Sequence, residues 1–261
     1  MVKSFSVIRR DEVHNLVASI RSTPNATVNM SEKALQLTSS VICRSAFGKD
    51  MFFGGTETSS TTIQWALSEL MKNPNVMAKA QAEVRWACKG KKDLDDNDLD
   101  ELKYLKLVIK ETLRLHPASP LLGLRECREE TMIDGYTIPL KTTVIVNGWA
   151  IARDPGSWNN PESFVPERLN NSVDFNGYHF QFIPFGAGSG MCPGMHFGLA
   201  NVVYPLAQLL YHFNWELPYG LQPEDLDMTE TCGISATRKN HLHLIAIPHD
   251  TSQYGHKILL S

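Results

Sequence analysis

Apolar residues recur at three- and four-residue intervals along most of the chain, which is the period of an amphipathic helix. Asp11 and Glu12 precede the first of these stretches, and Pro74 can both end one helix and begin the next. Residues 25–29 interrupt the pattern and are expected to form a turn. The helices that the pattern predicts span residues 11–20, 34–48, 50–73, 74–87, 102–113 and 199–213.

The pattern changes beyond Pro117, where shorter runs of β-branched and apolar residues predict a small amount of sheet. Asp134–Gly135, between two such runs, is typical of a tight hairpin. Residues 142–146 are expected to form a buried strand, and residues 241–247 a late strand. The expected fold class is therefore mainly α with a small β component, without internal repeats.

Composition excludes several classes of protein. The chain has 261 residues, with 25 Lys plus Arg against 28 Asp plus Glu, so its net charge is −3 and no basic patch favours nucleic acid as a partner. Its five cysteines are odd in number and widely spaced, which disfavours a disulfide scaffold and a Cys-rich zinc site. No run of apolar residues is long enough for a signal peptide or a transmembrane helix.

Two other patterns suggest a metal site, and each has a simpler interpretation. The acidic run 93–100 lacks the glycine and the final glutamate of a calcium loop, so a solvated loop with a helix N-cap is the better interpretation. His241 and His243 would share one face of the late strand. Without further ligands, two such histidines are more often ordinary surface residues than a metal site.

The most informative segment is the glycine-rich stretch 182–194, called the cysteine loop below, which contains Cys192 directly ahead of a predicted long helix. Unpaired N–H groups and the helix dipole favour a thiolate at such a position, and a thiolate can bind iron. Glycines allow a flat cofactor to approach the backbone. A small buried cysteine is the alternative interpretation. A dinucleotide loop is disfavoured, because neither register of G-x-G-x-x-G has its final glycine.

Three further motifs accompany the loop: Gly-Gly-Thr-Glu-Thr-Ser at 54–59, Glu-Thr-Leu-Arg at 111–114 and Pro-Glu-Arg-Leu at 166–169. In this order and spacing the chain resembles the cytochrome P450 haem-thiolate monooxygenases of the plant microsomal type. The cysteine loop resembles that family's F-x-x-G-x-R-x-C-x-G pattern. The resemblance predicts a partial P450 fold, the C-terminal catalytic half.

The resemblance also predicts how the chain is organised. It implies a single incomplete domain over 1–261, in which an upstream helical segment, 1–48, is fused to the haem-binding half, 50–249. Residues 250–261 match nothing. Family members are longer, so we expect that the membrane anchor is absent and that a second gap lies near Lys49.

Specific residues receive roles from the resemblance. Cys192 would be the axial thiolate ligand of the haem iron, and Phe185, Gly188 and Gly194 are the matching positions of the loop that binds the cofactor. Arg125 would face a haem propionate. Gly190 stands where the family has an arginine, which would remove another propionate partner.

Two further groups of residues receive roles in the same way. Thr58 would hold a hydrogen-bond network that Glu57 supplies with protons during oxygen activation. Glu111, Arg114 and Arg168 would form a charged triad that stabilises the core beneath the haem. The alternatives are a Thr/Ser-rich exposed helix face around 56–62 and an ordinary ion pair within a helix. Leu169 replaces the family's phenylalanine.

The implied activity is insertion of one atom of O2 into a small lipophilic substrate, with a terpenoid as the subfamily-level expectation. Electrons would come from NADPH through NADPH-cytochrome P450 reductase. The family lies on the cytosolic face of the endoplasmic reticulum membrane, whereas this chain, without an anchor, would be cytoplasmic or peripheral. The alternative hypothesis is a catalytically inactive truncated or spliced product that retains the haem loop.

Overall fold

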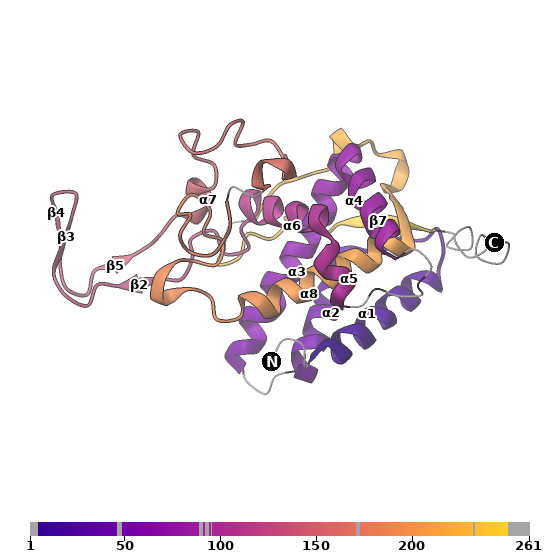
Figure 1. Ribbon diagram of the computed structural model, residues 1–261, viewed down its shortest axis with the longest axis horizontal. Coiled ribbons are helices and arrows are strands. Elements are labelled where there is room, and N and C mark those ends of the chain that lie inside the picture. Colours follow the sequence, from indigo (N-terminus) through magenta and orange to yellow (C-terminus); the bar gives the residue numbers. More distant parts are fainter. Residues whose placement is uncertain are drawn as a thin grey trace.

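The computed structural model describes residues 5–45, 49–88, 91, 94, 96–170, 173–231 and 233–249, and the fold is mainly helical, as the sequence predicts (Figure 1). The expected helix end at Gly48 and the unmatched tail 250–261 lie outside these residues. The main helices are α1 (Ser6–Arg21), α2 (Met30–Ser45), α3 (Lys49–Lys72), α4 (Pro74–Ala87), α6 (Lys103–Leu115) and α8 (Met195–His212). Two shorter helices are α5 (Asp96–Glu101) and α7 (Gly148–Ile151).

Helices α3 and α8 cross in the middle of the molecule (Figure 1). Helix α3 packs against α2, α4, α6 and α8, and buries Trp65, Leu67 and Leu70 completely. Helix α8 buries Leu206 and Leu210 in the same core. Each such side chain contributes about 1.5–3 kcal/mol when it leaves water, so burial at this crossing stabilises the fold.

A three-stranded antiparallel sheet joins the two ends of the chain. Its order is β1 (Thr27–Asn29), β7 (His243–Pro248) and β6 (Phe213–Glu216). The late strand is confirmed with shifted bounds, but a turn over the whole of 25–29 is wrong, because Val28 pairs with Leu244. The helix predicted to reach 213 ends one residue earlier, where β6 begins. Both differences arise from pairing between residues distant in sequence.

The remaining strands form an arm that extends away from the helices (Figure 1). It consists of β2 (Arg125–Glu126) paired with β5 (Thr143–Val144), and the hairpin β3 (Thr131–Ile133) and β4 (Tyr136–Ile138). Asp134 and Gly135 have positive φ of 49° and 83°, as a two-residue hairpin turn requires, so the predicted hairpin is confirmed. The buried strand expected at 142–146 is wrong, because only two residues pair and Ile145 is 53% exposed.

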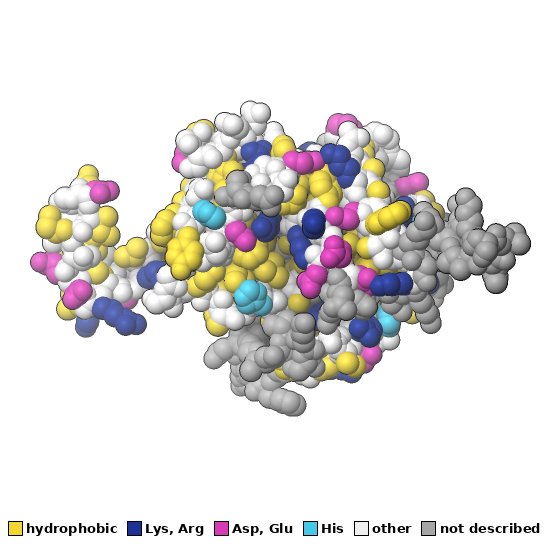
Figure 2. Space-filling model, viewed as in Figure 1, with side chains coloured by type: hydrophobic (Ala, Val, Ile, Leu, Met, Phe, Trp, Pro, Cys, Tyr) yellow, Lys and Arg dark blue, Asp and Glu magenta, His cyan; other side chains and the backbone are white. Residues whose placement is uncertain are grey.

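Apolar side chains are exposed on this arm (Figure 2). They are Leu124, Met132, Ile133, Tyr136 and Leu140. Clusters of exposed apolar side chains are uncommon on monomeric proteins, where they usually mark a contact surface. The arm therefore adds little to the core formed by the described residues.

The acidic run also differs from its expected structure. Its second half forms α5, and α6 begins after Leu102, whose side chain cannot cap a helix. Instead, the carboxylate of Glu83 in α4 accepts hydrogen bonds from the N–H groups of Tyr104 and Leu105, at 2.7 and 2.9 Å. This carboxylate satisfies two otherwise unpaired donors at the start of α6. Over the ranges that the structure describes, no cluster of three metal-binding side chains occurs.

Candidate functional site

Cys192 is exposed and lies in the last turn of the cysteine loop, three residues before α8 begins. Its N–H donates a hydrogen bond of 2.9 Å to the carbonyl of Phe185, which closes the loop. Gly186 and Gly188 have positive φ of 77° and 66°, a conformation that residues with a side chain rarely adopt. Because α8 begins just after the turn, the expected position of the cysteine ahead of a long helix is confirmed.

The other residues predicted to bind the cofactor lie in the same turn. A Cβ atom on Gly194 would stand 3.9 Å from the Sγ atom of Cys192, so the thiol lies directly against this backbone. The half-buried ring of Phe185 packs edge-on against Phe175, with 5.3 Å between centroids. Gly188 is exposed and has open space beside it. The structure therefore leaves one side of the thiol accessible.

Arg125 reaches the cysteine loop from β2. A Cβ atom on Gly190 would lie 2.8 Å from Nη2 and 2.9 Å from Cζ of the Arg125 guanidinium. A Cβ atom on Gly186 would lie 3.7 Å from the same Nη2. The guanidinium therefore occupies the space that a side chain at position 190 would need. Glycine at position 190 therefore means that the loop lacks the family's arginine, and it also leaves room for the guanidinium of Arg125.

The acid and hydroxyl predicted for oxygen activation lie on α3. Glu57 and Thr58 are both half-buried, and the Oγ1 atom of Thr58 donates a 2.6 Å hydrogen bond to the carbonyl of Gly54. The next residue, Ser59, places its Oγ atom 3.8 Å from where a Cβ atom on Gly198 would stand. Gly198 belongs to the beginning of α8, so this part of α3 packs near the helix that follows the cysteine loop.

The paired glycines of α3 differ in their surroundings. Helix α3 is continuous through both Gly54 and Gly55. A Cβ atom on Gly55 would lie 2.8 Å from the Cδ1 atom of Ile42, whereas one on Gly54 would meet no atom within 4 Å. Only the second glycine is therefore needed for close packing, here against α2.

This difference predicts opposite tolerance at the two positions. Alanine favours a helix over glycine by about 1 kcal/mol, so Gly54→Ala should stabilise the chain by up to about that amount. Gly55→Ala should lose this gain, because the added methyl group must displace Ile42. Urea denaturation of both variants measures the difference. Equal stabilisation by the two substitutions would contradict the assigned contact.

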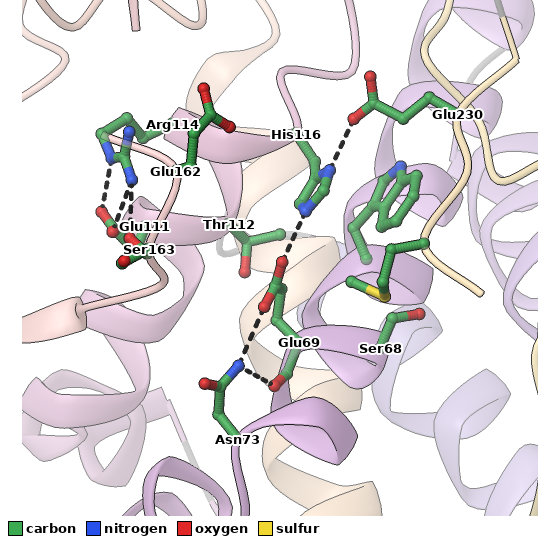
Figure 3. Close-up of polar contacts among 12 residues, drawn as sticks. Ser68, Glu69, Asn73, Glu111, Thr112, Arg114, His116, Glu162, Ser163 and Glu230 are labelled. Atoms are coloured by element: carbon green, nitrogen blue, oxygen red, sulfur yellow. Dashed lines mark hydrogen bonds and ion pairs between the residues drawn. The ribbon is translucent and has the colours of Figure 1, made fainter. Parts of the chain in front are cut away.

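The triad predicted from Glu111, Arg114 and Arg168 is present, and part of it is shown in Figure 3. The side chains of Glu111 and Arg114 are 0% exposed. Oε1 of Glu111 accepts hydrogen bonds from Nη2 of Arg114 at 2.8 Å, Nε of Arg168 at 2.9 Å and the N–H of Val165 at 2.9 Å. Its Oε2 atom accepts from Nε of Arg114 at 2.9 Å. The buried carboxylate is therefore fully hydrogen-bonded.

The two arginines connect this carboxylate to the segment after α7. Arg114 Nη1 donates to the carbonyls of Ala152 and Pro161, at 2.7 and 2.8 Å. Arg168 Nη2 donates to the carbonyls of Asn160 and Ser163, at 3.1 and 3.0 Å. Guanidinium groups can make several fixed hydrogen bonds at once, so the triad holds together a region that contains little regular structure.

Sequence reasoning missed a second buried polar group beside α3. It consists of Glu69, His116 and Glu230, called the His116 cluster below (Figure 3). Arg238 lies nearby, with its guanidinium 5.3 Å from the centre of the Trp65 ring. His116 lies two residues after the end of the Glu-Thr-Leu-Arg motif, but its partners are 47 and 114 residues away in sequence. No local pattern could have brought the three residues together.

Comparison with known proteins gives the family. The sequence profile described as "Cytochrome P450" matches residues 49–245. Premnaspirodiene oxygenase of Hyoscyamus muticus is 42% identical over 360 aligned positions, which cover 97% of this chain and 72% of that protein. The 5-epiaristolochene 1,3-dihydroxylase of Nicotiana tabacum is 63% identical over 205 positions, which cover 78% of this chain and 41% of that protein.

A solved structure agrees with the fold. A zebrafish cytochrome P450, determined with abiraterone, superposes with a TM-score of 0.83 at 20% identity, covering 94% of this chain and 78% of the other. At this identity the likeness establishes the fold alone. The profile match, in contrast, extends over most of the chain and includes Cys192, Thr58 and the charged triad. The chain therefore belongs to the cytochrome P450 family.

Proposed function

We propose that this chain is the haem-binding part of a haem-thiolate monooxygenase and that Cys192 supplies the thiolate ligand of the iron. The observation that carries the proposal is the exposed Cys192 thiol in a glycine turn, with the Arg125 guanidinium against the same loop. Haem needs one protein ligand, open backbone beside it and a cation for its carboxylates. The residues around Cys192 offer all three.

When bound, haem supplies the activation of O2 that allows one oxygen atom to be inserted into a C–H bond. In the proposal, the residues of the protein bind and orient the haem and deliver protons. The carboxyl group of Glu57 is the proton source, and the Oγ1–H of Thr58, now donated to the Gly54 carbonyl, turns to pass the proton on. Packing of α3 near the start of α8 supports this arrangement.

The substrate is proposed to be a small lipophilic molecule, with a terpenoid as the favoured class. The names of two relatives support this choice, because premnaspirodiene and 5-epiaristolochene are the compounds that those proteins are named for. Electrons are proposed to come from NADPH through cytochrome P450 reductase, on the cytosolic face of the endoplasmic reticulum. Among the described helices, none is long and apolar enough to cross a bilayer.

The proposal includes an internal gap near Lys49. The alignment with premnaspirodiene oxygenase runs over 360 positions although this chain has 261 residues, so many positions of that relative have no counterpart here. The family match begins at residue 49, where the upstream segment 1–48 would meet the half at 50–249. The exposed apolar arm favours the alternative, an inactive product that lacks part of the domain.

Haem reconstitution tests the proposed function and its alternative. The chain mixed with haem, reduced and exposed to carbon monoxide should show the red-shifted band typical of a thiolate ligand, and Cys192→Ser should abolish it. Cys127→Ser is the matched control and should keep the band, because Cys127 lies on the arm. A band that survives Cys192→Ser would refute the ligand assignment. A parent chain without the band would favour the inactive product.

Arg125 should contribute measurably to haem affinity. A hydrogen bond between charged groups is worth about 1.5–3 kcal/mol, so Arg125→Ala should raise the Kd for haem about tenfold or more. Gly190→Ala should also weaken binding, because its methyl group would displace the guanidinium. Arg128→Ala, which removes an exposed cation on the arm, is the control in the haem titration. Equal haem affinities for the parent and the three variants would contradict a role of Arg125 in haem binding.

A further inference from the structure

His116 lies between two carboxylates that come from different parts of the chain (Figure 3). Its Nε2 atom is 2.8 Å from Oε1 of Glu69 in α3, and its Nδ1 atom is 2.7 Å from Oε1 of Glu230. Both distances are those of strong hydrogen bonds. His116 itself ends α6, so the three residues connect two helices with the segment near the C-terminal strand.

The ring is shielded from water. The His116 side chain is 7% exposed, and its ring stacks on the buried indole of Trp65, with 3.9 Å between centroids and 3° between planes. The Glu69 side chain is 8% exposed, and its Oε2 atom accepts a 3.0 Å hydrogen bond from Asn73. Glu230 is less buried. Little solvent therefore separates these groups, and direct hydrogen bonds must satisfy them.

The two contacts determine how many protons the His116 ring must carry. A carboxylate only accepts hydrogen bonds, and a neutral imidazole has one N–H donor and one lone pair. With a carboxylate at each ring nitrogen, a neutral ring would direct a lone pair at a negative oxygen. A ring with a proton on both nitrogens instead donates to Glu69 and to Glu230. Only this form satisfies both contacts while both acids stay ionised.

Two arginines also act on the carboxylates of the cluster. The guanidinium of Arg238 lies 5.3 Å from the centre of the Trp65 ring and donates to Ser68 at 2.8 Å. Burial lowers the pKa of Arg238 below its ordinary value, although the carboxylates of Asp227 and Glu69 favour its charged form. Burial likewise lowers the pKa of Arg153, although the carboxylates of Glu230 and Glu162 favour its charged form.

We propose that His116 is a doubly protonated bridge between Glu69 and Glu230, and that loss of one ring proton releases the segment 227–231 and 233–240 from α3. This segment is called the bridge segment below. Besides the Glu230 contact, three hydrogen bonds between described residues join it to the rest of the chain. Trp65 Nε1 donates to the Ala236 carbonyl at 2.8 Å, the Ala236 N–H donates to the Ala118 carbonyl at 3.2 Å, and Arg238 donates to Ser68 at 2.8 Å.

The expected pH dependence of the bridge segment follows from the number of protons on the His116 ring. At low pH the ring donates both hydrogen bonds, and the bridge segment is held. As pH rises, one ring nitrogen loses its proton, one hydrogen bond is lost, and a lone pair faces a carboxylate. The bridge segment should then open more often, while the core around α3 and α8 stays folded. Release of the bridge segment requires neither haem nor the proposed activity.

Nitrogen NMR of the full chain tests the protonation state directly. At about pH 7, both ring nitrogens of His116 should show bound, slowly exchanging protons and the shifts of an imidazolium. His116→Gln identifies the signals by their loss, and the exposed His243→Gln serves as the matched control. A neutral ring with one unprotonated nitrogen would overturn the proposal.

Hydrogen exchange tests the release of the bridge segment. The amide of Ala236, which donates to the Ala118 carbonyl outside the bridge segment, reports on it. After correction for intrinsic exchange, its protection should fall about tenfold or more between about pH 6 and pH 9. Glu230→Gln should flatten this profile, because its amide can donate to a neutral ring. A flat profile in the parent chain, or equal slopes in both proteins, would overturn the proposal.

Discussion

Replacing Glu111 by alanine is expected to lower the free energy of unfolding by about 3–5 kcal/mol, because it strands two buried or half-buried guanidinium groups. Arg114 is 0% exposed and would keep its carbonyl partners but lose its counter-charge. The loss is comparable with the total stability of many domains, about 5–15 kcal/mol. Thermal and urea unfolding should therefore show a large shift, and the soluble yield should fall.

Asp100→Ala is the matched control for Glu111→Ala. Asp100 also pairs with a cation, Lys106, at 3.8 Å, but the two side chains are 82% and 38% exposed. Exposed ion pairs contribute roughly 0–1 kcal/mol, so this variant should unfold almost as the parent does. Glu111→Gln, which keeps the shape and removes the charge, should fall between the two. An unchanged unfolding curve for Glu111→Ala would contradict the role of the triad.

Trp65→Ala is expected to cost about 3–5 kcal/mol, the range for removing a large buried aromatic side chain. Trp65 is 0% exposed and lies at the centre of α3. Its loss leaves a cavity, removes the stack on His116 and leaves the Ala236 carbonyl without its donor. Urea denaturation monitored by circular dichroism measures the change.

Trp86→Ala is the control for Trp65→Ala. Trp86 is 74% exposed on α4, so its removal should change the stability by less than about 1 kcal/mol. Trp65→Phe keeps most of the buried area and the aromatic face but loses the indole donor. It should therefore cost less than Trp65→Ala. Similar unfolding midpoints for Trp65→Ala and Trp86→Ala would show that the α3 core is not packed as described.

Periodicity predicted the helices well because a helix buries residues that lie three or four positions apart in sequence. The spacing of Leu67 and Leu70 already indicates the buried face of α3. The hairpin at Asp134 and Gly135 was equally local, since its turn depends on two residues that tolerate positive φ. In contrast, β1 was predicted as a turn, because its partner strand lies more than 200 residues away.

The candidate site shows the same division. The resemblance located Cys192, Thr58 and the triad, each within a short motif, and the structure confirms the triad's contacts. The sequence also showed that Gly190 stands where the family has a cationic arginine. It could not show that Arg125 fills the resulting space, since that depends on how β2 packs against the cysteine loop.

The sequence by itself determined which stretches are helical, where the glycine turn with the cysteine lies, and which family motifs the chain carries. Only the tertiary structure decided that Glu69, His116 and Glu230 meet, and that the indole of Trp65 covers them. The physical reason is the range of the interactions. Helix periods and turns depend on neighbours a few residues apart, whereas the state of a buried ionisable group depends on every charge that folding brings beside it.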